Sequence, residues 1–214
     1  RRLAIATSAV RGAANSSDFV KIAEGRGFSV EIIKGEREAE LIYKGVRESM
    51  LLYDEVFLIM DIGGGSNEFI IADKNRIFWK ESFDMGVVRV RESYTLSEPV
   101  TESEALFLEN YYRDGMKSLW KALAHFKPTL LIGCSGSFDT LRELIYPEDD
   151  FSIPSLTMDS EKMLSLHQTL LRSSREERAA MKGMSPIRVD YIVIGSILVN
   201  LVISELNPQE ICQR

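Results

Sequence analysis

Cysteine, histidine and long apolar runs are scarce in this chain, and each shortage removes a class of protein. Its 214 residues include two cysteines, Cys134 and Cys212, which cannot build a disulfide framework and indicate a reducing, cytoplasmic compartment. The two histidines, His125 and His167, lack the spacing of metal ligands, so no zinc site is predicted. The most apolar stretch, residues 192–203, is too short to cross a bilayer and indicates a core helix, so no membrane partner is predicted.

Positive charge is also in deficit, with 26 lysines and arginines against 32 acidic residues and a net charge of −6. This balance argues against a nucleic-acid partner, because nonspecific binding to nucleic acid depends on excess basic charge. A polyanionic ligand would therefore depend on local arginines, lysines or a metal. The hydrophobic fraction of 45% is enough for a sizeable core, and the length fits one large domain or two small ones.

The segment Asp61–Glu68, which reads Asp-Ile-Gly-Gly-Gly-Ser-Asn-Glu, is the most informative part of the sequence. Its glycines let the backbone turn tightly and bring bare N–H groups against a ligand, as in the nests that bind anions. The neighbouring carboxylate of Asp61 would repel a phosphate unless a cation lay between them. The segment therefore predicts a phosphate cradle at Gly63, Gly64, Gly65 and Ser66 with Mg²⁺ held at Asp61.

The residues after the glycines decide which kind of cradle this is. A Walker loop and a dinucleotide fingerprint both continue into a helix. Here the β-favouring runs 69–72 and 77–83 follow, separated by turn residues, so the glycines are predicted to lie in a hairpin between strands. The alternative is a glycine-rich hairpin that binds nothing.

Alternating patterns elsewhere predict a mixed-sheet α/β fold. Further strands are predicted at 3–6, 30–33, 55–60 and 129–132. Helices are predicted at 11–15, 18–24, 37–52, 138–145 and 186–205. One long helix is predicted from a capping box at Thr101 and Glu104 to Pro128. A loop is predicted at 146–158, followed by two helices, the second of which is capped by Ser174 with Glu177.

Three stretches together carry a family resemblance: residues 6–15, residues 35–46 and Asp61–Glu68. Weaker matches occur at 133–137 and 188–195. In this order the chain resembles the exopolyphosphatase / guanosine pentaphosphate phosphohydrolase family, within the actin-like phosphotransfer fold of hexokinases, actin and the large heat-shock chaperones. The resemblance implies an actin-like (ribonuclease H-like) mixed sheet with an antiparallel hairpin and flanking helices. It places the end of a first domain at 1–38 and a second domain at 39–214.

The implied activity is hydrolysis of terminal phosphoanhydride bonds in polyphosphate or guanosine pentaphosphate, with Mg²⁺ as cofactor and a homodimer as the assembly. Glu38 matches the family's catalytic glutamate and Glu68 the glutamate that closes the second phosphate loop. Glu36 competes with Glu38 as the base, and both acids would also suit a helix N-terminus without any catalytic role. Arg11 is a candidate phosphate clamp, with a solvated helix arginine as the alternative.

The turn at Ser135, Gly136 and Ser137 joins a strand to a helix, so its N–H groups are predicted to bind a further phosphate. Cys134 is expected to be a packed thiol. The family's first phosphate loop and a closing Arg-Glu-Gly segment have no counterpart here, which predicts an internal fragment that lacks activity by itself. Two other functions stay open: a kinase of the same superfamily, and a nucleotide-driven binding module without catalysis.

Overall fold

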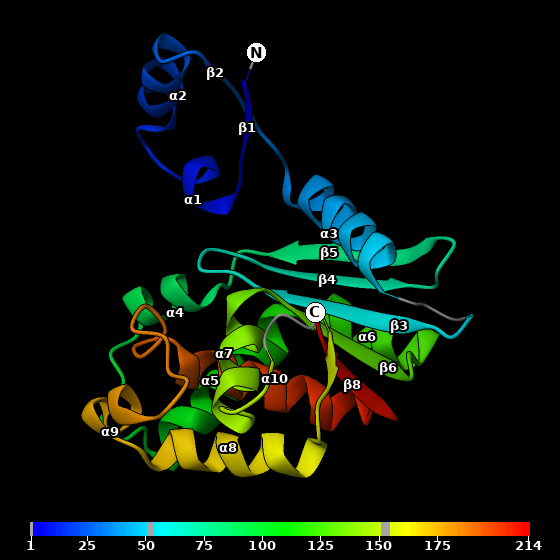
Figure 1. Ribbon diagram of the computed structural model, residues 1–214, viewed down its shortest axis with the longest axis vertical. Coiled ribbons are helices and arrows are strands. Elements are labelled where there is room, and N and C mark those ends of the chain that lie inside the picture. Colours follow the sequence, from blue (N-terminus) through cyan, green and yellow to red (C-terminus); the bar gives the residue numbers. More distant parts are fainter. Residues whose placement is uncertain (1, 51–53, 151–154) are drawn as a thin grey trace.

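The computed structural model describes residues 2–50, 54–150 and 155–214, and its strands form two separate sheets (Figure 1). In the small sheet, β1 (Arg2–Ala6) runs parallel to β2 (Phe28–Ile32). The crossover between them contains α1 (Ser8–Arg11) and α2 (Ser16–Gly25). Several large apolar side chains of this unit are exposed, namely Leu3, Ile5, Phe19, Ile22, Phe28 and Ile32.

The main sheet has the strand order β5-β4-β3-β6-β8-β7. Its bounds are β3 (Phe57–Ile62), β4 (Asn67–Ala72), β5 (Ile77–Phe83), β6 (Leu130–Cys134), β7 (Leu156–Thr157) and β8 (Glu210–Gln213). The hairpin-linked β4 is antiparallel to β3 and β5, while β6 and β8 run parallel to β3 and β7 is antiparallel to β8. The first strand of this sheet in the sequence, β3, lies at its centre, with the β4–β5 hairpin on one side and the parallel strands β6 and β8 on the other. This arrangement is ribonuclease H-like, and the predicted fold class is confirmed.

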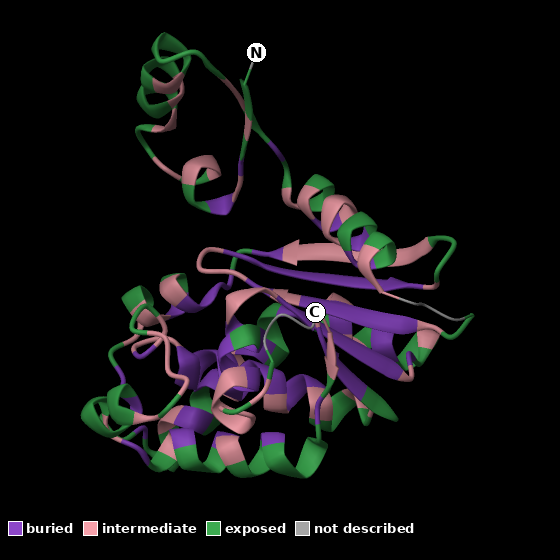
Figure 2. Ribbon diagram, viewed as in Figure 1, coloured by how far each residue is buried: buried purple, intermediate pink, exposed green. Residues whose placement is uncertain are grey.

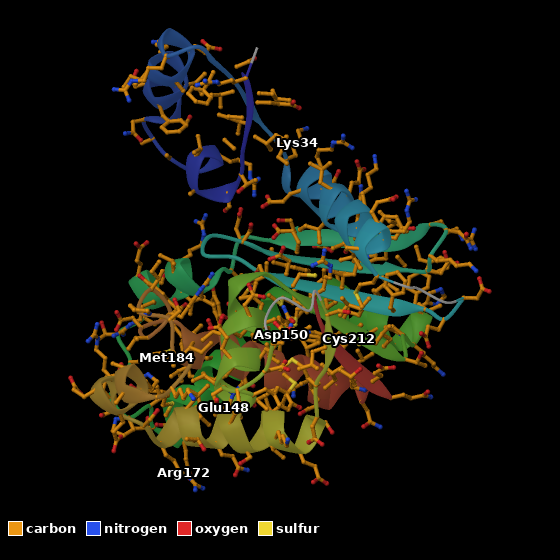
Figure 3. The ribbon with its side chains drawn as sticks, viewed as in Figure 1. Lys34, Glu148, Asp150, Arg172, Met184 and Cys212 are labelled. Atoms are coloured by element: carbon orange, nitrogen blue, oxygen red, sulfur yellow. The ribbon has the colours of Figure 1, made fainter. Side chains whose placement is uncertain are left out.

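Helices cover both faces of the main sheet (Figure 1). On one face lies α3 (Gly35–Ser49), whose Lys34 N-cap lies on the connection from β2 (Figure 3). The other face carries the remaining helices: α4 (Val87–Ser93), α5 (Glu102–Gly115), α6 (Lys117–Phe126), α7 (Ser135–Ile145), α8 (Ser160–Arg172), α9 (Arg175–Ala180) and α10 (Ile192–Leu206). Figure 2 shows the central strands buried between these layers, whereas the small sheet and the outer side of α8 are largely exposed.

Alternation along β3 divides its side chains between two cores. Leu58, Met60 and Ile62 face the larger core shared with α4 and α10, whereas Phe57 and Ile59 face the smaller core under α3. Because both faces are covered, β3 reads as an apolar run rather than as an alternating one. The same alternation places the next odd residue, Asp61, on the α3 face.

The structure corrects several predicted elements. The predicted long helix after Thr101 is two helices that meet at Met116, next to Gly115; a Cβ at Gly115 would lie 2.4 Å from the Cε of Met85, so this glycine lets Met85 pack at the break. Residues 12–15 are not helical, because α1 ends at Arg11. The helix predicted from residue 186 begins at Ile192.

The elements α4, β7 and β8 were not predicted. Both capping boxes, at Thr101 and Ser174, are confirmed. Residues 51–52 of the predicted 37–52 helix, and 151–154 of the predicted 146–158 loop, lie outside the described residues. Within the described ranges, no helix has both the length and the apolar character needed to span a bilayer.

Candidate active site

Three acids predicted from the sequence face one another beneath α3. Asp61 on β3 and Glu68 on β4 are direct partners in the antiparallel ladder, so their side chains leave the sheet on the same face. That face is covered by α3, whose first turn carries Glu38. Like charges directly opposite each other destabilise a pair of strands, so the presence of two acids here points to a functional role and not to a contribution to stability.

Burial dominates the electrostatics of the two ladder acids. It raises the pKa of Asp61, and the carboxylates of Glu38 and Asp139 raise it further, while a hydrogen bond from Ser135 and the charge of Arg188 oppose the rise. Asp61 thus combines a desolvated carboxyl group with the nearby guanidinium of Arg188.

Glu68 is only 2% exposed, and burial raises its pKa to about 7, with Glu38 and Asp61 adding to the rise. Hydrogen bonds from Ser82, whose Oγ lies 2.6 Å from Oε1 of Glu68, and from Ser66 oppose it. Near neutral pH this carboxyl is divided between its protonated and ionised forms. A cation or a nearby guanidinium would draw it to the ionised form.

Arg11 and Glu38 meet although they belong to different parts of the fold. Arg11 Nη1 donates to the carbonyl of Ile33 at 2.8 Å and to Oε2 of Glu38 at 3.2 Å. Their side chains are 24% and 18% exposed, so the ion pair is partly shielded. The candidate clamp and the candidate base are therefore adjacent, whereas Glu36 is exposed.

The glycine loop is a tight turn between β3 and β4. Gly63 N–H donates to the Ser66 carbonyl at 3.0 Å, and a Cβ on Gly65 would lie 2.5 Å from the Oγ of Ser8. Ser66 is buried, and its hydroxyl is engaged with Glu68, so Ser66 can offer a phosphate its backbone N–H. The predicted hairpin is confirmed, while phosphate binding by it stays a prediction.

The turn after β6 lies next to this loop. Ser135 Oγ donates to the Ile62 carbonyl at 3.1 Å, and its φ of 68° is a left-handed conformation uncommon outside glycine. A Cβ on Gly136 would lie 2.2 Å from Nη2 of Arg188, so the guanidinium lies against the first turn of α7. Ser137 is 2% exposed and packs toward α10, so its side chain is part of the core.

Sequence reasoning missed Ser8, Ser82 and Arg188 as site residues. Ser82 needed the β4–β5 register, which pairs it with Glu68. Ser8 lies within the family-like stretch 6–15, and its buried Oγ has no hydrogen-bond partner among the described residues. Arg188 opens the family-like stretch 188–195, but only the fold brings it to Gly136. Cys134 is a buried thiol, as predicted, and burial raises its pKa to about 12, with Asp61 adding to the rise.

The acids do not form a metal cage. Across residues 2–50, 54–150 and 155–214, no group of three His, Cys, Asp or Glu side chains is arranged to hold a metal ion. Mg²⁺ commonly uses one or two carboxylates, with substrate phosphates and water completing its shell. The chemistry of Asp61 and its ladder partner therefore fits Mg²⁺ that arrives with a phosphorylated ligand.

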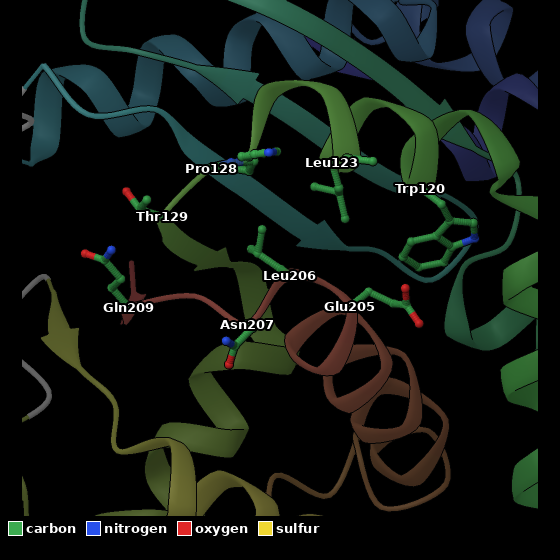
Figure 4. Close-up of a pocket in the computed structure, with 10 residues that line it drawn as sticks. Trp120, Leu123, Pro128, Thr129, Glu205, Leu206, Asn207 and Gln209 are labelled. Carbon is green, nitrogen blue, oxygen red and sulfur yellow. The ribbon is translucent and has the colours of Figure 1, made fainter.

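A pocket of about 480 Å³ lies at the other end of β6, between the C-terminal ends of α6 and α10 (Figure 4). Its lining includes Trp120, Leu123, Thr129 and Leu206, with Glu205 as its acid. Glu205 already forms an ion pair with Arg113. This pocket lacks the acids and glycine loop of the other end, so the candidate active site is the Asp61 end.

Comparison with known proteins identifies the family of this chain. A family model described as the Ppx/GppA phosphatase family matches residues 2–213. The chain is 27% identical to Exopolyphosphatase 2 of Mycobacterium tuberculosis, over 96% of this chain and 67% of that protein. It is 36% identical to a crystallised exopolyphosphatase from Cytophaga hutchinsonii, with a TM-score of 0.94 over 99% of this chain and 70% of that one. A Ppx/GppA family member from Aquifex aeolicus, 22% identical with a TM-score of 0.82, shares the fold.

Proposed function

Because the chain belongs to the Ppx/GppA phosphatase family, we propose that it hydrolyses terminal phosphoanhydride bonds and releases orthophosphate from inorganic polyphosphate. The observation that carries the proposal is the convergence of Glu38, Asp61 and Glu68 beside a glycine loop at the end of β3. Desolvated acids next to bare backbone amides suit phosphoryl transfer to water, which needs an oriented nucleophile and charge stabilisation.

Each residue has a role that its surroundings support. Glu38 would orient the attacking water and accept its proton, while Arg11, which now pairs with Glu38, would turn its remaining N–H groups to a phosphate. The oxygen of water bonds to the terminal phosphorus, the bridging P–O bond breaks, and the shortened polyphosphate leaves with the electron pair. The N–H groups of Gly64, Gly65 and Ser66 would hold the equatorial oxygens.

The second cradle is proposed at the turn after β6. The N–H groups of Ser135 and Gly136, at the start of α7, would contact the next phosphate of the chain together with the Arg188 guanidinium. Ser137 was part of this predicted set, and its buried position leaves it only a supporting role.

Mg²⁺ is proposed at Asp61, directly or through water, with Glu68 as the second nearby carboxylate. When bound, the ion would neutralise charge on the phosphates and lower the cost of ionising the desolvated acids. Asp61 lies on β3, two residues before the first glycine of the loop. This placement therefore follows from the position of Asp61 beside the glycine loop.

A phosphate-release assay tests the proposal. The full-length protein is incubated with long-chain polyphosphate and with guanosine pentaphosphate in parallel, with Mg²⁺ or with a chelator, and the Cytophaga hutchinsonii relative serves as positive control. We expect Mg²⁺-dependent orthophosphate release from polyphosphate. Release only from guanosine pentaphosphate would change the substrate, and ATP consumption coupled to phosphorylation of an alcohol, without release, would replace hydrolysis by kinase activity.

We also infer a cytoplasmic location and a homodimer. Cys134 and Cys212 are both free and buried, which suits a reducing compartment. The exposed apolar side chains of the small sheet supply a surface that association would cover. Fractionation of the native host and sedimentation of the purified protein test the two inferences separately.

A further inference from the structure

The start of α4 is bonded to the carbonyls of all three glycines in the loop. Val87 N–H donates to the Gly63 carbonyl at 3.0 Å, and Val88 N–H to the Gly64 carbonyl at 2.9 Å. Gly86 N–H donates to the Gly65 carbonyl at 3.3 Å. The N–H groups at a helix start usually lack partners, and here they are used to hold the glycine loop.

These bonds fix the direction of every peptide plane in the loop. In a trans peptide the carbonyl of one residue and the N–H of the next point in opposite directions, and the cis bond of the described chain lies elsewhere, at Glu98–Pro99. Carbonyls turned toward α4 therefore turn the N–H groups of Gly64, Gly65 and Ser66 away from it. None of these three N–H groups has a hydrogen-bond acceptor within the described residues.

Arg89 adds a side-chain contact to this arrangement. Its backbone N–H donates to the Gly64 carbonyl at 3.1 Å, and its Nε donates to the Gly65 carbonyl, also at 3.1 Å. The guanidinium therefore contacts the carbonyl that precedes the Ser66 N–H. The nearest acid, Asp84, lies 3.9 Å from Nη2 and is mostly exposed, so it does not compete strongly for Nε.

Gly86 shows that the approach of α4 is close. A Cβ at Gly86 would lie 2.4 Å from the Gly64 carbonyl oxygen and 2.6 Å from the Gly65 carbonyl carbon. Those atoms belong to the backbone and cannot rotate away as a side chain would. A side chain at position 86 would therefore separate α4 from the loop.

We propose that Arg89 and the first turn of α4 are the positioning elements that aim the N–H groups of Gly64, Gly65 and Ser66 at the bound phosphate. The inference rests on the proposed function, since it assigns the orientation of the same loop. Arg89 acts through the Gly65 carbonyl, so it is a positioning residue and does not contact the reacting atoms.

The test combines phosphate binding with kinetics on Arg89→Ala and Arg89→Lys. Amide resonances of Gly64, Gly65 and Ser66 are followed during a titration with inorganic phosphate, and kcat and KM are measured with polyphosphate. We expect the three wild-type resonances to shift together. In both variants, phosphate affinity and kcat/KM for polyphosphate should fall about five- to tenfold, because neither alanine nor lysine has a planar Nε donor to reach Gly65.

Two glycine variants and one arginine variant sharpen the test. Gly86→Ala should lose more phosphate affinity than Arg89→Ala, whereas Gly45→Ala, where an added Cβ meets nothing within 4 Å, should leave it unchanged. Arg91→Ala removes a charge from the same helix but not the loop contact, and it should also bind phosphate normally. Thermal melts identify any variant that fails to fold. If Gly86→Ala fails to fold, the proposal is judged on Arg89→Ala and Arg89→Lys, because Arg89 is exposed and its replacement should not affect folding.

Several results would overturn the proposal. If Arg89→Lys bound phosphate like the wild type while Arg89→Ala did not, Arg89 would be a direct charge contact. If the three wild-type amide resonances did not move with phosphate, the loop would not present them. If phosphate moved these resonances but polyphosphate gave no release, the proposed activity would fail while the positioning role stood.

Discussion

Nη1 of Arg11 lies 3.2 Å from Oε2 of Glu38, which joins the small sheet to the first turn of α3. The same Nη1 contacts the Ile33 carbonyl at the end of the small sheet. A phosphate bound by the remaining N–H groups of Arg11 would share this guanidinium with Glu38, so ligand binding and the strength of the ion pair are coupled at one residue.

Replacing Glu38 by glutamine should remove the proposed base while keeping the shape of the side chain. We expect kcat for phosphate release to fall at least about 100-fold, the lower range for loss of a general base. The change in unfolding free energy should stay below ~1 kcal/mol, because the ion pair is partly exposed.

The matched control is Glu36→Gln, which alters the exposed acid two residues earlier in the same helix turn. It should change kcat less than twofold, because the exposed Glu36 is not the proposed base. A large loss in Glu36→Gln with near-normal turnover in Glu38→Gln would transfer the role of base to Glu36.

Arg178→Met should be among the most destabilising substitutions outside the apolar core. Arg178 is 1% exposed; it donates to the carbonyls of Ser173 and Val189 and forms an ion pair with Glu98 at 2.6 Å. Removing one partner of such a pair costs about 3–5 kcal/mol, measured as unfolding free energy in urea.

Arg175→Met on the same helix provides the comparison. Its pair with Asp190 is as short, at 2.7 Å, but the Arg175 side chain is 52% exposed. The expected loss is below ~1 kcal/mol. Equal losses in the two variants would show that burial does not govern these ion pairs.

His167 predicts a loss of stability in mild acid. Burial lowers its pKa to about 4, and its Nδ1 lies 3.1 Å from the Oγ of Ser196. Since the folded-state pKa lies below the ordinary value near 6.5, the contribution is present above pH 6.5 and is lost as pH falls toward 4. It amounts to about 3 kcal/mol over that window.

Urea unfolding from pH 4 to 8 measures this slope. His167→Gln should flatten it, whereas the same change at the exposed His125 should leave it as in the wild type. An unchanged slope in His167→Gln would assign the acid sensitivity to the carboxyl groups.

Gly136→Ala should act on the site through Arg188. The three atoms nearest to the new Cβ all belong to the flexible end of that side chain, with Nη2 at 2.2 Å, so folding should be preserved while the guanidinium moves. We expect Gly136→Ala and Arg188→Ala to raise KM for polyphosphate by a similar factor, and the double variant to add little. Additive effects would place the two residues in independent roles.

Local patterns predicted the elements that depend on local chemistry. The Asp61–Glu68 hairpin and the capping boxes at Thr101 and Ser174 follow from turn residues and side-chain reach within a few positions. The helix break at Met116 lies against Met85, which is distant in sequence, and α4 is held by its bonds to the glycine loop. Such elements are fixed by tertiary contacts that periodicity does not contain.

The residues of the candidate site likewise fall into those that a local motif predicts and those that only the fold brings together. Asp61, Glu68 and the glycines lie in one continuous motif, so the sequence brings them together directly. Ser82 and Arg188 reach the site through strand register and through the approach to Gly136, and neither is visible before the fold is known. Ser137 is the opposite case: the motif predicted it as a site residue, but the fold buries its side chain in the core.

The exposed apolar side chains of the small sheet also bear on how the molecule behaves in solution. A two-stranded sheet with Leu3, Ile5 and Phe28 in water is marginal by itself and adheres readily to other apolar surfaces. The same unit carries Arg11, so whatever shields its apolar side chains also sets how firmly Arg11 stays at Glu38. Solubility and the state of the candidate base are thereby linked at one end of the molecule, and light scattering measured beside activity across protein concentrations would reveal that link.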